Sequence, residues 1–307
     1  MEATTHDVII VGGGPAGLTA GIYARRSKLE ALLIEKMAPG GQVLSTHWVD
    51  NYPGFPEGIA GFDLSDRMRQ QAERFGLSIV SDEITGASLE GPEKVIRGVE
   101  REYRTRAVIV ASGAVWKKLG VPGEERLAGR GVSYCATCDG PFYQDLEVAV
   151  VGGGDSAVQE AVYLTRFAKK VYLIHRRDQL RACRILQEKA LSHPKVEPLW
   201  KRVVESVEGT DQVEALRLKA LDGLVPETLP VQGVFVYVGI QPNTDWLRGL
   251  VPLDPQGFIP TDERMATPVP GVFAAGDVRK KMVRQISTAV GDAATALLAA
   301  EHYLENS

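Results

Sequence analysis

The apolar positions of this chain form short β-branched runs that precede glycine-rich turns and helical stretches. Residues 8–11 read VIIV and are followed by GGGPAG at 12–17, an alanine-rich stretch, and the apolar run ALLIE at 31–35. A short apolar run bounded by glycine is typical of a buried strand in a parallel sheet. The pattern therefore predicts a strand–helix–strand unit near the beginning of the chain.

The same pattern occurs a second time at a constant offset. Residues 148–151 read VAVV and are followed by GGGDSA at 152–157, a helical stretch, and VYLIH, which ends at His175. Glu35 ends the matching run of the first copy, so both the glycine turn and the last strand residue recur 140 positions later. We therefore predict an α/β protein with two Rossmann-like dinucleotide-binding domains.

Both glycine turns meet the physical needs of a pyrophosphate-binding loop. The first glycine permits a tight turn, the next lets phosphates approach the backbone, and the last small residue lets the helix pack closely on the strand. The N–H groups at the helix N-terminus then hold the phosphates. One such string also fits an ordinary glycine-rich turn, but two copies in the same context favour nucleotide sites. The candidate residues are Gly12, Gly14, Pro15, Ala16 and Gly17 in the first loop, and Gly152, Gly154, Asp155, Ser156 and Ala157 in the second.

The two copies differ where an adenosine ribose would be recognised. Glu35 can accept hydrogen bonds from both ribose hydroxyls and repels a 2′-phosphate, which suits FAD or NAD. His175 replaces it in the second copy, and a cationic set follows that suits a 2′-phosphate: Arg176, Arg177 and Arg181. On its own this basic string would indicate a solvated helix start. Because it follows this particular strand, we expect the second site to bind NADPH.

A pair of cysteines lies between the two glycine loops. Cys135 and Cys138 stand three residues apart in CATCDG, and a four-residue turn brings its ends within about 7 Å, which a disulfide can span. Half of a zinc site and two buried thiols are the other interpretations, but no second CxxC or HxxxH accompanies the pair. We therefore predict a reversible redox disulfide and no metal. The remaining cysteine, Cys183, is interpreted as a packing residue or an idle thiol.

Composition and charge narrow the class of protein. The 307 residues are 44% hydrophobic and 24% charged, which is usual for a folded protein of about two domains. A net charge of −4 favours neither nucleic acid nor an anionic membrane as partner. No apolar stretch approaches the roughly 20 residues that cross a bilayer, and the first ten residues lack a signal-type pattern, so we expect a cytoplasmic protein. In that compartment a disulfide is expected to be catalytic.

In order and spacing, the motifs resemble those of the low-molecular-weight thioredoxin reductases of bacteria and plants. The resemblance rests on GGGPAG, CATCDG, GGGDSA with HRRDQLR, and PGVFAAGDV, and it covers essentially the whole chain. It implies that an NADPH domain at 116–245, which carries the cysteine pair, is inserted into an FAD domain made of 1–115 and 246–307. It also implies a homodimer.

The resemblance further implies roles for individual residues. The cysteine that matches Cys138 faces the flavin, the one that matches Cys135 attacks the partner protein, and the acid that matches Asp139 handles protons. The aspartate of PGVFAAGD would bind the ribityl chain, and the helix that begins near Gln285 would direct its positive end at the flavin. The implied flavin contacts are Gly12, Gly14, Gly17, Glu35, Gly40, Gly41, Gln42, Asn51, Gly276, Asp277, Arg284, Gln285 and Ile286.

The implied reaction is a two-electron relay from NADPH to FAD, then to the Cys135–Cys138 disulfide, and then to the disulfide of thioredoxin. Only 14 residues separate Cys138 from Gly152, so the dithiol and the NADPH loop belong to one domain and take turns at one flavin. The family achieves this by rotating the NADPH domain. Here the hinges are expected at 111–114 and 238–243.

Two departures from the family pattern concern the partner and the nucleotide. Pro141, Phe142 and Tyr143 stand where several relatives have two adjacent aromatics, in the segment that docks thioredoxin together with the residue matching Arg130. Asp155 and Ser156 replace an Asn and a Thr, which adds a carboxylate near the pyrophosphate. The alternatives are therefore the same chemistry on another protein or low-molecular-weight disulfide, and a non-catalytic flavin-bound redox sensor.

Overall fold

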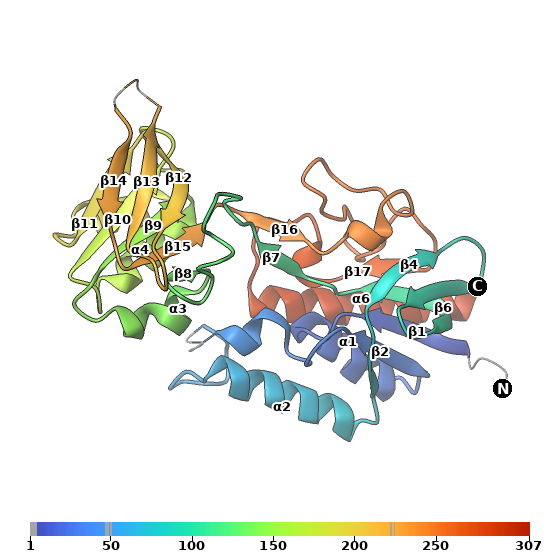
Figure 1. The fold of residues 1–307 in the computed structure, drawn as a ribbon. Coiled ribbons are helices and arrows are strands. Elements are labelled where there is room, and N and C mark those ends of the chain that lie inside the picture. The colour runs from blue at the N-terminus through green and yellow to red at the C-terminus, as the bar shows by residue number, and fades with distance from the viewer. Residues whose placement is uncertain (1–4, 47–48, 50, 222, 224) are drawn as a thin grey trace. The chain divides into compact units, whose positions relative to one another are not determined.

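The computed structural model describes residues 5–307 except 47, 48, 50, 222 and 224, and for Ser45, Thr137 and Cys138 it describes the backbone alone. The chain divides into two compact units (Figure 1): unit 1 is Met1–Val115 with Gln241–Ser307, and unit 2 is Trp116–Ile240. The predicted domain bounds, 1–115, 116–245 and 246–307, stay a prediction. The chain passes between the units within β7 (Ala114–Trp116) and β16 (Ile240–Pro242), which pair with each other.

Unit 1 is built on one seven-stranded sheet. Four strands run parallel in the order β3-β2-β1-β6, namely β3 (Ser78–Ser81), β2 (Ala31–Glu35), β1 (Thr5–Val11) and β6 (Glu102–Val110). The order continues from β6 through the antiparallel strands β5 (Lys94–Gly98) and β4 (Ile84–Ser88), and β17 (Val272–Ala274) also pairs with β6. The two apolar runs predicted as strands are thus β1 and β2, side by side and parallel.

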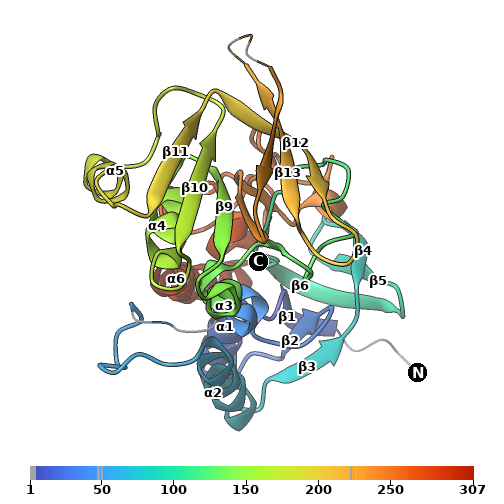
Figure 2. The same cartoon turned by 60° about the vertical axis from the view of Figure 1, so that its left-hand side comes forward.

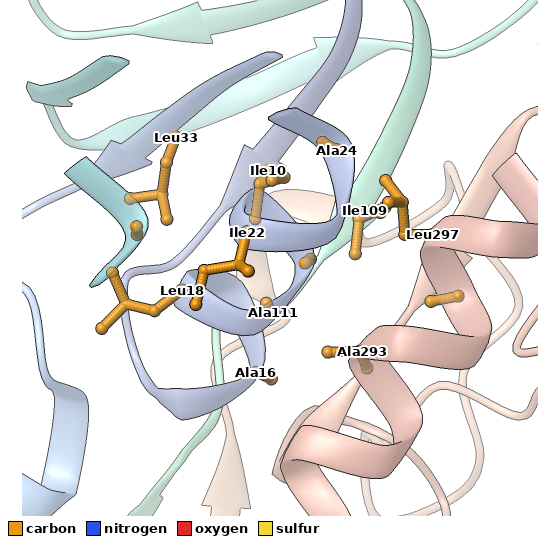
Figure 3. Close-up of a cluster of buried hydrophobic side chains, with 14 of the residues drawn as sticks. Ile10, Ala16, Leu18, Ile22, Ala24, Leu33, Ile109, Ala111, Ala293 and Leu297 are labelled. Atoms are coloured by element: carbon orange, nitrogen blue, oxygen red, sulfur yellow. The ribbon is translucent and has the colours of Figure 1, made fainter. Parts of the chain in front are cut away.

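Both faces of this sheet are buried, which explains why its central strands are apolar throughout rather than alternating. On one face, Ile10 and Ile109 pack against α1 (Pro15–Arg26), α2 (Gly61–Arg74) and α6 (Ile286–Asn306). The view of this cluster in Figure 3 labels Ala16 on α1 and Ala293 on α6, small side chains where these two helices meet. On the other face, Ile9 contacts a second apolar cluster.

Unit 2 repeats the arrangement of the first strand–helix–strand unit. Figure 2 shows β9, β10 and β11 side by side. The parallel sheet has the order β11-β10-β9-β15-β8, with β11 (Val196–Trp200), β10 (Lys170–His175), β9 (Glu147–Gly152), β15 (Gly233–Tyr237) and β8 (Val132–Ser133). Its helices are α3 (Ala136–Asp139), α4 (Asp155–Leu164) and α5 (Arg184–Leu191). The predicted fold, two Rossmann-like units with one inserted in the other, is confirmed.

The remaining elements are short. Unit 2 also has an antiparallel sheet of β12 (Arg202–Glu208), β13 (Ala215–Ala220) and β14 (Glu227–Pro230). Single 3-10 turns are η1 (Gly41–Ser45), η2 (Gly140–Tyr143), η3 (Asp245–Leu247) and η4 (Gly276–Val278). None of the helices in the described part of the chain has both the length and the apolar character that crossing a membrane requires.

Candidate functional site

A cleft of about 480 Å³ opens in unit 1 where β1 and β6 end and the first glycine loop leads into α1. Ligands of open parallel sheets bind at such carboxyl ends. Residues from seven separate segments line the cleft. Those predicted from the sequence are Gly12, Gly14, Pro15, Ala16, Glu35, Gly41, Gln42, Gly276, Asp277, Gln285 and Ile286. The structure therefore brings together positions that are up to 274 residues apart.

The first glycine loop is compact because helix and strand leave no room for side chains. Gly12 has φ +107°, a conformation that few L-residues adopt. A Cβ atom at Gly17 would overlap the carbonyl oxygen of Gly12, so α1 can lie on the loop only with glycine there. Gly14, the residue before α1, has no side-chain cap, so N–H groups of the first helical turn are available to an anion.

The Glu35 carboxylate lies at the wall of the cleft and is held by the backbone. Its Oε2 accepts a hydrogen bond from Gly13 N–H at 2.6 Å, and its Oε1 accepts one from Met37 N–H at 3.0 Å. Two backbone donors fix the orientation of a carboxylate while each oxygen keeps a lone pair for a further donor. The position of Glu35 therefore suits the two hydroxyls of a ribose.

Asp277 offers the clearest sign of a missing partner. It follows Gly276 in η4, and its Oδ1 is buried without a hydrogen-bond partner among the described residues. Burial raises the pKa of Asp277; Lys281 and Arg284 oppose that rise, and Asp292 adds to it. Leaving a buried carboxylate oxygen unpaired is costly. A hydroxyl donor in the cleft, such as those of a ribityl chain, would satisfy it.

The beginning of α6 also lines the cleft, through Gln285, Ile286 and Ala289. Gln285 is its N-cap, and its side chain and that of Thr288 cap each other's backbone N–H groups. Asn51 donates from Nδ2 to Gln285 Oε1 at 2.9 Å. Four predicted flavin contacts lie outside the cleft lining: Gly17, Gly40, Asn51 and Arg284. The guanidinium of Arg284 stacks on Phe258 at 4.1 Å.

The second glycine loop, in unit 2, repeats the same tight packing. A Cβ at Gly152 would approach the Cβ of Ala157 to 2.6 Å. Gly153 O accepts hydrogen bonds from the N–H groups of Arg181 and Ala182, at 2.6 and 3.1 Å. These bonds hold the basic segment against the loop, which brings Arg181 close to the start of α4.

Asp155 links the second glycine loop to the basic segment through a hydrogen bond. Its Oδ1 accepts a hydrogen bond from the N–H of Cys183 at 2.7 Å, and Cys183 is the N-cap of α5. The carboxylate added by Asp155 thus links the beginnings of α4 and α5. The neighbouring Ser156 is exposed.

His175 differs from the arginines that follow it. The side chains of Arg176, Arg177 and Arg181 are exposed, whereas His175 is only 5% exposed. Its ring fills the space that a side chain at Gly153 would occupy. Burial lowers the pKa of His175, and the charges of Arg181, Arg176 and Arg177 lower it further. His175 therefore supports the loop as a neutral ring, and the three arginines form the cationic set.

The cysteine pair lies at α3, and Cys135 is disulfide-bonded. Cys138 lies within α3, with its side chain outside the described part of the structure. Asp139 ends α3, and its N–H donates to Cys135 O at 3.1 Å. Cys183 is a free, exposed thiol. The described residues contain no group of His, Cys, Asp and Glu side chains arranged to hold a metal ion.

Two buried hydroxyl groups that no motif predicts hold the backbone at this disulfide. Ser133 Oγ accepts the N–H of Cys135 at 3.1 Å, and the Tyr237 hydroxyl accepts the N–H of Ala136 at 2.7 Å. Tyr237 also pairs with Gly152 across β15 and β9. Tyr237 therefore connects the redox turn to the second glycine loop inside one unit.

Two dinucleotide-type loops and a disulfide next to one of them define a nucleotide-dependent disulfide oxidoreductase. A family model described as pyridine nucleotide-disulphide oxidoreductase matches residues 6–293. The thioredoxin reductases of Peptoclostridium acidaminophilum and Bacillus subtilis (strain 168) are 46% and 47% identical to this chain. The alignments cover 98% and 99% of this chain and 97% and 96% of those proteins.

A solved structure gives the same result. The thioredoxin reductase of Lactococcus lactis, in its FR conformation, matches with a TM-score of 0.89 and 42% identity over 99% of this chain and 100% of that one. This chain belongs to the pyridine nucleotide-disulphide oxidoreductase family and, within it, to the low-molecular-weight thioredoxin reductases. The family uses FAD and NADPH, so the cofactor prediction is confirmed.

The packing at Gly17 generates a first prediction. Gly17→Ala should push α1 away from the loop, and the purified protein should bind FAD at least tenfold more weakly. Titration of the flavin-free protein with FAD, followed by flavin fluorescence, measures this. Gly86→Ala is the control, because a Cβ at Gly86 meets no described atom within 4 Å. Wild-type FAD affinity in Gly17→Ala would contradict the packing argument.

Proposed function

We propose that this chain is an NADPH-dependent thioredoxin reductase in which the Cys135–Cys138 pair is the redox-active disulfide. The observation that carries the proposal is that the disulfide-bonded Cys135 shares unit 2 with the arginine-bearing glycine loop, while unit 1 holds the cleft with an unpaired Asp277 oxygen. Unit 1 would then be the FAD domain and unit 2 the NADPH domain.

The residues of the cleft fit FAD. Glu35 would accept hydrogen bonds from the adenosine ribose, and the first turn of α1 would hold the pyrophosphate. Asp277 would accept a ribityl hydroxyl, and the N–H groups at the beginning of α6 would favour negative charge at the ring. Bound FAD supplies a carrier that takes two electrons from a nicotinamide and gives them to a disulfide.

The residues of unit 2 fit NADPH. The start of α4 after Gly154 offers N–H groups without a side-chain cap, which suits the pyrophosphate. The exposed arginines at 176, 177 and 181 would pair with the 2′-phosphate. Because Arg181 is tied to Gly153 O, its position relative to the loop is set by the backbone.

The chemistry at the cysteines is thiol–disulfide exchange. The Cys135 thiolate attacks one sulfur of the thioredoxin disulfide, so a mixed disulfide forms and the other thioredoxin sulfur leaves as a thiol. The Cys138 thiolate then attacks Cys135 Sγ, which re-forms the internal disulfide and releases thioredoxin as a dithiol. Asp139 would donate the proton that the leaving thiolate takes up.

Serine variants of the two cysteines test the assignment. Cys135→Ser and Cys138→Ser should each reduce thioredoxin at least 100-fold more slowly, because each removes one sulfur of the exchange. NADPH should still bleach the bound flavin in both variants. Cys183→Ser, which removes the free exposed thiol, is the matched control and should keep full activity. Substantial thioredoxin reduction by either active-pair variant would overturn the proposal.

The same assay separates the two alternatives. An enzyme with another partner would oxidise NADPH with a different protein or low-molecular-weight disulfide and not with thioredoxin. A redox sensor would show no turnover with any disulfide. Phe142 and Arg130 are exposed and lie in the segment that would dock the partner.

The arginines generate a prediction about nucleotide choice. Replacing Arg176, Arg177 and Arg181 together by alanine should raise KM for NADPH at least tenfold and change KM for NADH little, because only NADPH carries the 2′-phosphate. Steady-state kinetics with both nucleotides provide the measurement. Arg217→Ala, an arginine of β13 paired with Glu205, is the control. A wild-type protein with higher kcat/KM for NADH would refute the role of the arginines.

We also propose that unit 2 rotates against unit 1 between the two half reactions. The chain crosses between the units only at two places, each with a glycine, Gly113 and Gly239, beside the short pair β7 and β16. A lysine-to-lysine crosslink joining the units should stop turnover but spare one half reaction. A monofunctional amine reagent is the control. Full turnover in the crosslinked protein would exclude rotation.

We also propose that the protein is a homodimer and that it lies in the cytoplasm, where NADPH is available and exposed thiols stay reduced. Sedimentation equilibrium should give about twice the chain mass of 33.3 kDa. A concentration-independent mass of one chain would disprove the dimer.

A further inference from the structure

A second, largely buried aspartate lies near Asp277, and no motif in the sequence predicts it. Asp292 is on α6, and its side chain is 12% exposed. Its Oδ1 contacts Arg279 Nη1 at 2.8 Å, and its Oδ2 contacts Lys281 Nζ at 2.7 Å. The same Oδ2 accepts a hydrogen bond from the N–H of Gly276 at 3.1 Å. We name Asp292, Arg279 and Lys281 the Asp292 cluster.

The cluster is a buried arrangement rather than a surface ion pair. The side chains of Arg279 and Lys281 are 11% and 10% exposed. A carboxylate taken out of water needs donors on both oxygens, and Asp292 has three. Arg279 also donates from Nε to Thr261 Oγ1 at 2.8 Å. The ion pairs within the cluster therefore offset the cost of removing each of its charges from water.

The Asp292 cluster holds the segment 276–281, whose residues Gly276 and Asp277 line the cleft. Gly276, Arg279 and Lys281 belong to the stretch that contains η4, so Asp292 fastens this stretch to α6 at its beginning and at its end. Gly276 has φ +79°, and a Cβ there would come within 3.0 Å of Ala16 Cβ at the first glycine loop. The segment is thus confined between α1 and α6. The residue next to Gly276 is Asp277, whose Oδ1 is the unpaired oxygen of the cleft.

The charged groups of this corner balance in number. The acidic groups are Asp277, Asp292 and Asp254, which faces Arg284. The basic groups are Arg279, Lys281 and Arg284. Removing the charge of Asp292 would leave one positive charge in excess at the wall of the cleft. A more positive wall favours whichever form of a bound ligand carries more negative charge.

We propose that Asp292 is a positioning residue of the flavin site, which holds the η4 segment so that Asp277 faces the cleft and limits the positive charge there. This inference rests on the proposed FAD site in unit 1. It assigns Asp292 two separable effects: a geometric one through the N–H of Gly276, and an electrostatic one through Arg279 and Lys281. The first governs FAD affinity, and the second governs the flavin midpoint potential.

Two variants separate these effects. Asp292→Asn keeps an oxygen that can accept the N–H of Gly276 but loses the charge, whereas Asp292→Ala loses both. FAD titration of the flavin-free full chain should give a Kd at least tenfold higher for Asp292→Ala and within threefold of wild type for Asp292→Asn. In Asp292→Asn the reduced flavin should be favoured tenfold more than in wild type, which for a two-electron couple raises the midpoint potential by about 30 mV.

The control is Asp66→Asn, which removes another helical carboxylate of unit 1 paired with an arginine, Arg69, at 2.7 Å. It should leave both FAD affinity and potential unchanged. Wild-type FAD affinity in Asp292→Ala would overturn the geometric role. If that variant does not fold, an unchanged potential in Asp292→Asn overturns the electrostatic role by itself. Failure of the proposed function is distinguishable, because then the wild-type chain would bind no FAD or reduce no thioredoxin.

Discussion

The structure depends on how closely α1 can approach the end of β1. Because a side chain at Gly17 would overlap the backbone of Gly12, the helix starts immediately at the loop, and its first N–H groups face the cleft. The same closeness lets α6 pack on α1 through alanines, which brings the η4 segment beside the loop. In unit 2, Ala157 plays the part of Gly17 with a similar lack of space. Small residues therefore shape both glycine loops, and the charged side chains that distinguish the two sites lie around the loops.

The two loops share a backbone and differ in charge. Beside the first loop lies Glu35, whose carboxylate oxygens accept two backbone N–H groups. Its negative charge therefore lies where a ribose would bind. Beside the second loop lies the buried, neutral His175, and the exposed arginines follow it in the sequence. In the proposed function, a few side chains on one common fold distinguish a free from a phosphorylated ribose. The disulfide lies in the unit with the cationic loop, so in the proposed function NADPH and the disulfide reach the flavin in turn.

Buried polar atoms without a hydrogen-bond partner among the described residues occur near both glycine loops and elsewhere, for example at Ser65 and Glu160. Asp277 Oδ1 and His175 Nε2 are buried without hydrogen-bond partners among the described residues. Asp292 pairs with the largely buried side chains of Arg279 and Lys281. A core built for stability alone would satisfy or replace such groups. Of these groups only Asp277 lines the cleft, and in the proposed function a hydroxyl of FAD pairs with its oxygen.

The sequence by itself determined the strands and helices around both glycine loops, which follow from local periodicity and from motifs whose spacing is fixed by one strand–helix turn. The insertion of one unit in the other, and the cleft residues beyond the first loop and Glu35, were implied by the resemblance to a known family. Together these predictions cover 11 of the 23 residues that line the cleft. Only the tertiary structure decided that Tyr237 holds Ala136, 101 residues away, that Asp292 holds Gly276, and that His175 is buried. These contacts depend on which faces meet after packing. No pattern of neighbouring residues encodes them, because hydroxyls and carboxylates at such positions look the same as solvated ones until the fold closes.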